Sequence, residues 1–236
     1  MQIFYNDQIS EDDKCLLLEK NETKHIIKVL RNKIGDIINL TNGNGYLFKA
    51  KISEIISNKC KLEIIEKTFE SDVKFKINIA IAPTKINERT EWFLEKVTEI
   101  GVGSINPIIC ENSERRKIKV DRFNKVLISA MKQSLRLYKP KLNQLVDFKT
   151  FINNCKSDLK LISYCKQSDN HLSNYINTEN KNISIVIGPE GGFTEKEINY
   201  AVKMGFQSVS LGKKRLRTET AGIVAAQVLS KLNLEI

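Results

Sequence analysis

The chain has 236 residues, of which 41% are hydrophobic and 28% are charged, with only 4 prolines. This composition is typical of a globular protein of one or two domains, and it excludes collagen-like, mucin-like and disordered chains. No apolar stretch approaches the roughly 20 residues of a membrane helix, and the N-terminus lacks the features of a secretory signal. We therefore expect a cytoplasmic protein.

The five cysteines are spread along the chain without a Cys-x-x-Cys pair. That spacing is typical of neither a disulfide framework nor a zinc site. His25 and His171, the only histidines, lie far from any pattern of cysteines or carboxylates that would complete a metal site. We expect no metal centre.

The positive charge is unevenly distributed. The net charge of the chain is +10. Residues 1–72 carry 11 basic and 12 acidic side chains, whereas residues 73–236 carry 27 basic and 16 acidic side chains. Between Glu114 and Lys141 there are ten cations and two acids. A bias of the genome toward lysine could raise the total, but it would not concentrate cations locally. The distribution predicts a polyanion-binding surface on the later domain.

The first part of the chain has the pattern of a small β-rich unit. A short helix is expected at Thr23–Arg31, with Asn21 as its cap. Alternating or apolar runs, separated by turn signals, then predict three strands. These strands are Asp36–Leu40, Tyr46–Ile56 and Lys59–Ile65, with a hairpin turn at Ser57-Asn58, and the polar segment Glu66–Lys74 is the expected domain boundary.

From Lys76 the pattern alternates between strands and helices. Strands are expected at Ile77–Pro83, Ser104–Cys110, Leu159–Cys165, Ile183–Ile187 and Ser208–Leu211. Helices are expected at Glu88–Ile100, Val120–Leu137, Glu195–Met204 and Thr218–Leu232. Such alternation favours a mostly parallel sheet with helices on both faces. Ligands bind beyond the carboxyl ends of the strands in sheets of this kind.

Two loops at strand ends could carry chemistry. The first is Gly188-Pro189-Glu190-Gly191-Gly192, where glycines would let backbone amides approach a ligand closely. It matches neither a phosphate-binding P-loop nor a dinucleotide fingerprint, and a tight strand-to-helix turn would also explain it.

The second loop leads from Leu211-Gly212 through Lys213-Lys214-Arg215 to Arg217-Thr218-Glu219-Thr220. Thr218 and Glu219 suit a helix N-terminus, but a cation such as Arg217 is unfavourable there unless an anion compensates it. An unfavourable local choice indicates a site. The helix that follows is small and apolar nearly all round, so we expect it to be buried on more than one side.

These motifs, together with His25 and Val29-Leu30-Arg31, resemble the RsmE family over essentially the whole chain. That family consists of S-adenosylmethionine-dependent enzymes that methylate N3 of a uridine in 16S ribosomal RNA of the small subunit. The resemblance implies a PUA-like β-barrel RNA-binding domain at residues 1–72. It also implies a SPOUT α/β domain at residues 73–236, with a parallel sheet and a C-terminal trefoil knot. A homodimer is implied as well.

The resemblance also implies a set of S-adenosylmethionine-binding residues. Carried over by position, they are Ile187, Gly188, Gly192, Leu211, Gly212, Leu216 and Thr218. The chain departs from the family at Lys213, where a proline is frequent. It departs again at Lys132, which stands in place of a glutamate in the stretch that ends at Arg136.

Methylation of uracil N3 requires that its proton be accepted and that negative charge on the ring be stabilised. Arg217 and Arg136 are the candidates for stabilising charge on the uracil oxygens. Glu219 and Glu190 are the candidate proton acceptors. Glu219 could instead be a helix cap or a partner of Arg217, and Glu190 could simply belong to the turn.

RNA contacts are implied for His25 and Arg31, and the basic patch predicts contacts from Arg115, Arg116 and Lys117. Two other functions remain open from the sequence. One keeps the fold and cofactor but methylates a ribose 2′-oxygen, and the other is an RNA-binding assembly factor without activity.

Overall fold

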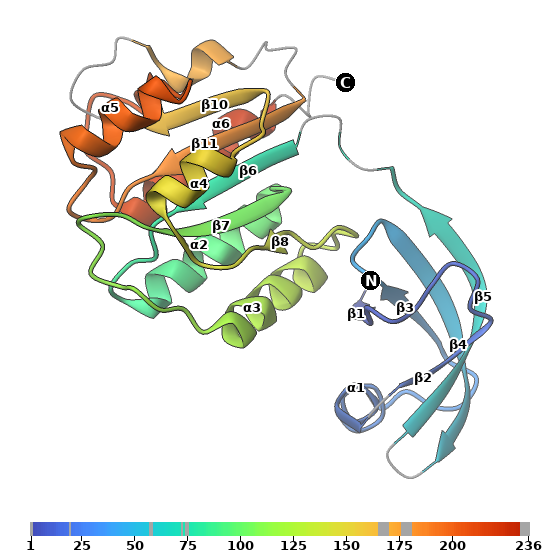
Figure 1. Ribbon diagram of the computed structural model, residues 1–236. Coiled ribbons are helices and arrows are strands. Elements are labelled where there is room, and N and C mark those ends of the chain that lie inside the picture. Colours follow the sequence, from blue (N-terminus) through green and yellow to red (C-terminus); the bar gives the residue numbers. More distant parts are fainter. Residues whose placement is uncertain are drawn as a thin grey trace. The chain divides into compact units, whose positions relative to one another are not determined.

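The computed structural model describes residues 2–18, 20–56, 59–71, 73, 76–164, 170–175 and 181–231. The chain divides into two compact units (Figure 1). The first comprises Met1–Asp72 and Met131–Lys139, and the second comprises Val73–Ala130 and Pro140–Ile236. The sequence pattern does not predict that Met131–Lys139 belongs to the first unit.

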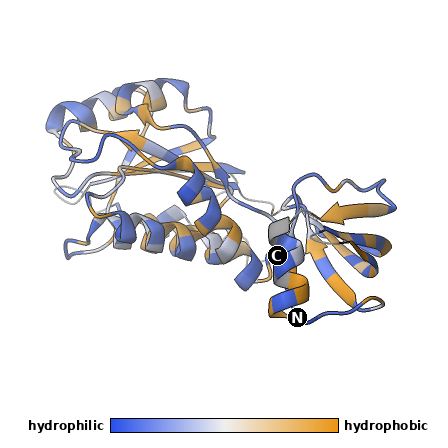
Figure 2. Ribbon diagram, turned by 90° about the horizontal axis from the view of Figure 1, so that it is seen from below, coloured by the Kyte–Doolittle hydropathy of each residue, from blue (hydrophilic) through white to orange (hydrophobic). Residues whose placement is uncertain are grey.

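Within the described residues, the first unit forms a five-stranded sheet in the order β1-β3-β4-β5-β2. The strands are β1 (Ile3–Tyr5), β2 (Cys15–Leu18), β3 (Ile37–Thr41), β4 (Tyr46–Ile56) and β5 (Lys59–Phe69). In β4, Phe48, Ala50 and Ile52 are buried while Lys49 and Lys51 between them are exposed. Figure 2 shows this alternation of hydrophobic and hydrophilic residues along the strands. The prediction of a β-rich unit is confirmed.

Strand β5 continues beyond Ile65, where the sequence pattern predicts its end. Residues 66–69 remain paired with β4. The Lys49 ammonium lies 2.7 Å from the Glu66 carboxylate, and the rings of Tyr46 and Phe69 lie 4.8 Å apart. The polar residues Glu66–Thr68 thus belong to an exposed part of a strand, and the predicted boundary begins inside it.

The N-terminal helix is shifted relative to its prediction. It consists of α1 (Lys20–Lys24) and the π-helical turn η1 (His25–Val29). The Thr23 hydroxyl donates a hydrogen bond of 3.0 Å to the carbonyl of Leu18, and Ile26 is fully buried. Arg31, which was expected to be helical, has a φ of 59°.

The second unit is built on a parallel sheet, as predicted. In the described residues it has seven strands in the order β12-β10-β11-β6-β7-β8, with β9 also paired to β7. They are β6 (Lys76–Ile81), β7 (Ser104–Ile109), β8 (Lys141–Leu142), β9 (Val146–Asp147), β10 (Leu159–Ser163), β11 (Asn182–Ile187) and β12 (Gln207–Val209). The expected strand end at Cys165, helix end at Leu232 and turn at Ser57-Asn58 lie outside the described residues.

Helices cover both faces of this sheet (Figure 1). They are α2 (Asn87–Ile100), α3 (Val120–Gln133), α4 (Phe148–Asn154), α5 (Glu195–Lys203) and α6 (Thr218–Ser230), with a short 3₁₀ turn η2 at Leu172–Tyr175. One core joins α2, α3 and α6 to the face that carries Ile77 and Ile79. A separate core joins α4 and α5 to the face that carries Ala80 and Val186. The knot that the resemblance implies stays a prediction.

Helix α3 ends at Gln133, four residues earlier than the pattern predicts. Leu135 has a φ of 58°, which takes the chain out of the helix. The following segment pairs with a turn of the first unit, because Gly45 N donates to Leu137 O and Lys139 N donates to Gly43 O. Tertiary hydrogen bonds thus override a favourable helical pattern.

Helix α6 buries one broad face, while Gln227 on the opposite side is exposed, so the chain alone does not bury the helix on more than one side as predicted. On the buried face, Gly222 makes close contacts with α2 and β6. A Cβ at this position would lie 2.5 Å from an atom of the Phe93 ring and 3.1 Å from Ile81. Phe93 is itself fully buried in α2. Only glycine therefore lets α6 pack this closely on α2 and β6.

We expect Gly222→Ala to lower the free energy of unfolding by about 1–3 kcal/mol, because overpacking outweighs the roughly 1 kcal/mol gained in helix propensity. Chemical denaturation followed by circular dichroism measures this. A Phe93→Leu background should reduce the loss, and a more stable Gly222→Ala protein would contradict the packing argument.

Candidate functional site

A cavity of about 700 Å³ lies at the carboxyl edge of the parallel sheet. Its walls come from the segment after β10, the loop after β11 and the start of α6. The lining residues are Ser163, Tyr164, Ile187, Gly188, Pro189, Glu190, Gly191, Gly192, Phe193, Arg215, Leu216, Arg217, Thr218 and Ala221. Its size and position are those of small-molecule sites in open α/β sheets.

The glycine loop after β11 requires glycine for definite reasons. Gly192 has a φ of +75°, and its amide donates to the carbonyl of Pro189 at 2.8 Å. A Cβ on Gly191 would lie 2.9 Å from Cβ of Asn112. The loop is thus a tight turn that also presents its backbone to the cavity.

The loop is held from outside the cavity by the segment after β7. The side-chain amide of Asn112 donates to the carbonyls of Gly191 and Gly192, at 3.4 and 3.0 Å. Thr194 and Glu197 form a capping box that begins α5. The buried Glu197 carboxylate also accepts a hydrogen bond of 2.9 Å from Glu111 N. These bonds fix the loop before any ligand binds.

The start of α6 is joined directly to the glycine loop. The Thr218 hydroxyl donates to Gly188 O at 3.0 Å, and the Arg215 guanidinium donates to Glu190 O at 2.9 Å. The Glu190 carboxylate accepts a hydrogen bond of 2.9 Å from Lys85 N. Glu190 therefore has a clear role in holding the turn.

Arg217 is the exposed N-cap residue of α6, and its side chain makes no capping hydrogen bond. It lines the cavity at the positive end of the helix dipole. An exposed cation in this position is suited to an anion or to developing negative charge in the cavity.

Glu219 is oriented differently. Its side chain is only 6% exposed, and its Oε1 lies 3.8 Å from Nε of Arg89 on α2. Its Oε2 is buried without a hydrogen-bond partner among the described residues. Glu219 is not among the residues that line the cavity. The ion pair with Arg89 is one that sequence reasoning missed.

Five of the seven expected cofactor residues line the cavity: Ile187, Gly188, Gly192, Leu216 and Thr218. The other two do not line it: Leu211 packs against the core, while Gly212 has a φ of +136° and its amide donates to the Ser210 hydroxyl.

Tyr164, Phe193 and Arg215 line the cavity without having been expected there. Tyr164 directly follows β10, so the rule that ligands bind at carboxyl strand ends could have identified it.

Three expected functional residues belong to the first unit: His25, Arg31 and Arg136. Arg31 is exposed, and burial lowers the pKa of the Arg136 guanidinium below its ordinary value.

The basic segment after β7 has a mixed role. Arg115 Nε donates to Thr84 O at 2.8 Å, and its Nη2 donates to Lys85 O. Arg116 and Lys117 are exposed. With Lys85 and Glu114, the three cations line a shallow cavity of about 410 Å³. Arg115 thus holds the backbone, while Arg116 and Lys117 are directed to solvent.

In the described part of the chain, no group of three or more histidine, cysteine or carboxylate side chains could hold a metal ion. Among the same residues, none of the helices has the length and apolar character needed to cross a membrane.

Comparisons with known proteins agree with this architecture. Residues 71–230 match the RNA methyltransferase domain family, and residues 18–65 match the RNA methyltransferase PUA domain family. The chain is similar to ribosomal RNA small subunit methyltransferase E of Mesomycoplasma hyopneumoniae, with 33% identity over 93% of this chain and 96% of the relative. The corresponding protein of Buchnera aphidicola is 32% identical over 98% of this chain and 93% of the relative.

Solved structures give the same result. A probable rRNA-methyltransferase from Porphyromonas gingivalis superposes with a TM-score of 0.90 and 38% identity, covering 99% of both chains. Ribosomal RNA small subunit methyltransferase E from Neisseria gonorrhoeae, bound to S-adenosyl methionine, superposes with a TM-score of 0.85 and 29% identity. The match covers 96% of this chain and 95% of that structure. With a domain match over most of its length and full-length relatives above 30% identity, the chain belongs to the RsmE family of ribosomal RNA small subunit methyltransferases.

Proposed function

We propose that this protein transfers the methyl group of S-adenosylmethionine to N3 of a uridine in 16S ribosomal RNA. The observation that carries the proposal is the cavity at the carboxyl edge of the sheet, enclosed by the glycine loop and by Arg215–Thr218. The family supports it, since a relative of this fold holds S-adenosyl methionine.

The residues of the cavity fit this cofactor. Around Gly192, the position of a Cβ is open, so the backbone is accessible there. Ile187 and Leu216 supply apolar walls, while Gly188 and Gly192 supply backbone groups. These residues, with Thr218 holding the loop, would bind the cofactor. S-adenosylmethionine supplies an activated methyl group when bound.

The remaining chemistry falls to the chain's own side chains. Arg217 would stabilise the negative charge that develops on the uracil oxygens as N3 loses its proton. Glu219, paired with Arg89, would hold the start of α6 so that Arg217 faces the cavity. A proton-accepting role for Glu219 or Glu190 and a catalytic role for Arg136 stay predictions.

Binding of the ribosomal RNA would involve both units. The PUA domain would contribute His25 and Arg31, and the second unit would contribute Arg116 and Lys117. Their charges suit contacts with phosphate groups, which set affinity more than sequence preference. We further propose that the protein acts as a homodimer in the cytoplasm, where its proposed substrate is assembled.

The function is tested by incubating the purified protein with labelled S-adenosylmethionine and small ribosomal subunits from cells that lack the enzyme. Mass spectrometry of the digested RNA should identify 3-methyluridine. A 2′-O-methylated nucleoside would overturn the proposed target atom. The absence of both methylation and cofactor binding would overturn the enzymatic function.

We expect Arg217→Ala to lower kcat by about 100-fold or more, the usual loss when one charge-stabilising donor is removed. Affinity for S-adenosylmethionine should change little, since Arg217 is proposed to act on the uracil. Single-turnover methylation and calorimetry separate the two effects. Lys214→Ala, which alters an exposed cation outside the cavity, is the matched control. Equal losses in both variants would remove the special role of Arg217.

Arg116→Ala and Lys117→Ala should each reduce the salt dependence of RNA binding by about 0.7 to 0.9 in the logarithmic slope, because each exposed cation releases about one counterion. Arg115→Ala should leave the slope nearly unchanged and should instead lower stability, since Arg115 donates to two backbone carbonyls. Filter binding at several salt concentrations measures the slopes. Equal slopes for Arg116→Ala and the unmodified protein would contradict the assignment.

A further inference from the structure

One face of the parallel sheet changes character along its strands. In the carboxyl half, Ala80, Ile108 and Val186 are buried beneath α4 and α5. In the amino half of the same face, the corresponding positions are polar, as at Asn78 and Ser184. Parallel sheets covered on both faces normally have continuous apolar strands. The polar half therefore needs an explanation other than core packing.

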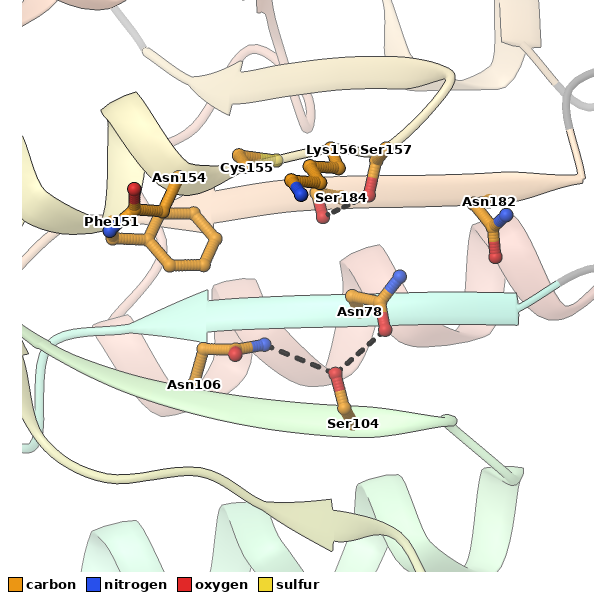
Figure 3. Close-up of a pocket in the computed structure, with 10 residues that line it drawn as sticks. All are labelled: Asn78, Ser104, Asn106, Phe151, Asn154, Cys155, Lys156, Ser157, Asn182 and Ser184. Atoms are coloured by element: carbon orange, nitrogen blue, oxygen red, sulfur yellow. Dashed lines mark hydrogen bonds between the residues drawn. The ribbon is translucent and has the colours of Figure 1, made fainter.

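A separate cavity of about 350 Å³ opens over this polar half (Figure 3). It is lined by Asn78, Ser104, Asn106, Phe151, Asn154, Cys155, Lys156, Ser157, Asn182 and Ser184. A neighbouring cavity of about 240 Å³ shares four of these residues and extends to Asn143 and Gln144. Neither cavity shares a residue with the one at the carboxyl edge. We call the two neighbouring cavities the amide groove.

A row of hydrogen bonds fixes the floor of the amide groove, as Figure 3 shows in part. The Ser104 hydroxyl donates to Asn78 Oδ1 at 2.7 Å, and Asn106 Nδ2 donates to the same hydroxyl at 3.2 Å. Asn143 Nδ2 donates to Asn106 Oδ1 at 2.7 Å, and Asn78 Nδ2 donates to Ile183 O at 3.2 Å. The amide groups are thus held in defined orientations before any ligand arrives.

Each of these amides keeps hydrogen-bonding capacity. An asparagine amide has two N–H donors and two lone pairs. In the described part of the molecule, Asn78 and Asn106 each use one donor and one acceptor in the row. One donor and one acceptor therefore remain on each planar group. This pair is complementary to the polar edge of a nucleobase.

The walls of the amide groove add an aromatic ring and one lysine, and two more lysines lie at the strand positions beside it. Phe151 on α4 is half-buried and contributes its ring to the cavity. Lys156 is the charged lining residue, and Lys76 and Lys141 are paired in register with Asn182 and Ser104. All three lysines are exposed.

Asp158 follows the lining residue Ser157, and its carboxylate accepts a hydrogen bond of 2.9 Å from Asn182 N. Uncharged amides, one aromatic ring and a cationic rim together match the parts of a nucleotide: base edge, base face and phosphate.

We propose that the amide groove is a nucleotide-binding site, distinct from the cavity proposed for methyl transfer. The base would lie against Phe151 with its edge on the amides of Asn78 and Asn106, and the phosphate would lie beside the lysines. The nucleotide could belong to an unpaired stretch of RNA or be a free mononucleotide. The site does not depend on methyl transfer.

The test uses the full-length, ¹⁵N-labelled protein saturated with S-adenosylhomocysteine, so that the carboxyl-edge cavity is occupied. The four ribonucleoside 5′-monophosphates are titrated one at a time while backbone and side-chain amide signals are followed by NMR. Saturable shifts of Asn78, Asn106 and Asn154 are expected with at least one of them. No shift with any of the four, or the same shifts with inorganic phosphate alone, would overturn the proposal. Binding in the carboxyl-edge cavity would instead shift the backbone amide signals of Gly188 and Gly192. Failure of this proposal can therefore be distinguished from failure of the proposed function.

Two variants on α4 refine the test against a matched control. Phe151→Leu keeps an apolar side chain but removes stacking, so the Kd should rise roughly fivefold or more. Asn154→Ala should also raise the Kd. Asn153→Ala is the matched control. Asn153 is an exposed residue of the same helical turn, it accepts a hydrogen bond from the Tyr200 hydroxyl, and it does not line the groove. This substitution should leave the Kd unchanged.

Equal effects of the three substitutions would overturn the site. A short single-stranded oligonucleotide that binds at least tenfold more tightly than the mononucleotide would identify RNA as the source. Equal affinities would identify the free nucleotide.

Discussion

The hydrogen bond from the Thr218 hydroxyl to the carbonyl of Gly188 joins the two segments on which the cavity at the carboxyl edge of the sheet depends. The bond connects the loop after β11 to the first turn of α6, which are 30 residues apart in the chain. It ties the glycine backbone to the helix turn that begins after Arg217. Because the donor lies at a helix N-terminus, its position is in turn set by the packing of α6 against α2 and β6.

The same loop is supported from its outer side by side chains that never reach the cavity. Asn112 donates to the carbonyls of Gly191 and Gly192, and Glu190 accepts from Lys85 N. Arg115 holds the carbonyls of Thr84 and Lys85. Methyl transfer needs mainly alignment of two groups, so a rigid support of this kind serves the proposed chemistry. A part of the positive charge that suggests RNA binding is therefore structural.

The parallel sheet serves two different purposes on its two halves. Its carboxyl edge opens into the cavity formed by loops, as the geometry of α/β sheets favours. One face of its amino half carries amides and hydroxyls where apolar residues would otherwise be expected. Buried or half-buried polar side chains are stable only when hydrogen-bonded, and the row from Asn78 to Asn143 satisfies that condition while leaving capacity for a ligand.

The sequence by itself determined the features that depend on local patterns. Apolar runs and alternation indicate most strands, glycines and Thr194 indicate turns and helix starts, and the unfavourable position of Arg217 indicates a site. Each of these signals acts over a few residues, so it can be read without the fold.

Only the tertiary structure decided which side chains meet. It paired Glu219 with Arg89, brought Tyr164 to the cavity and directed Arg115 to backbone carbonyls. It also ended α3 early, because residues 137–139 bond to the turn at Gly43–Gly45. In each case the partner is distant in the chain, and hydrogen bonds and packing between distant segments leave no periodic pattern in the sequence.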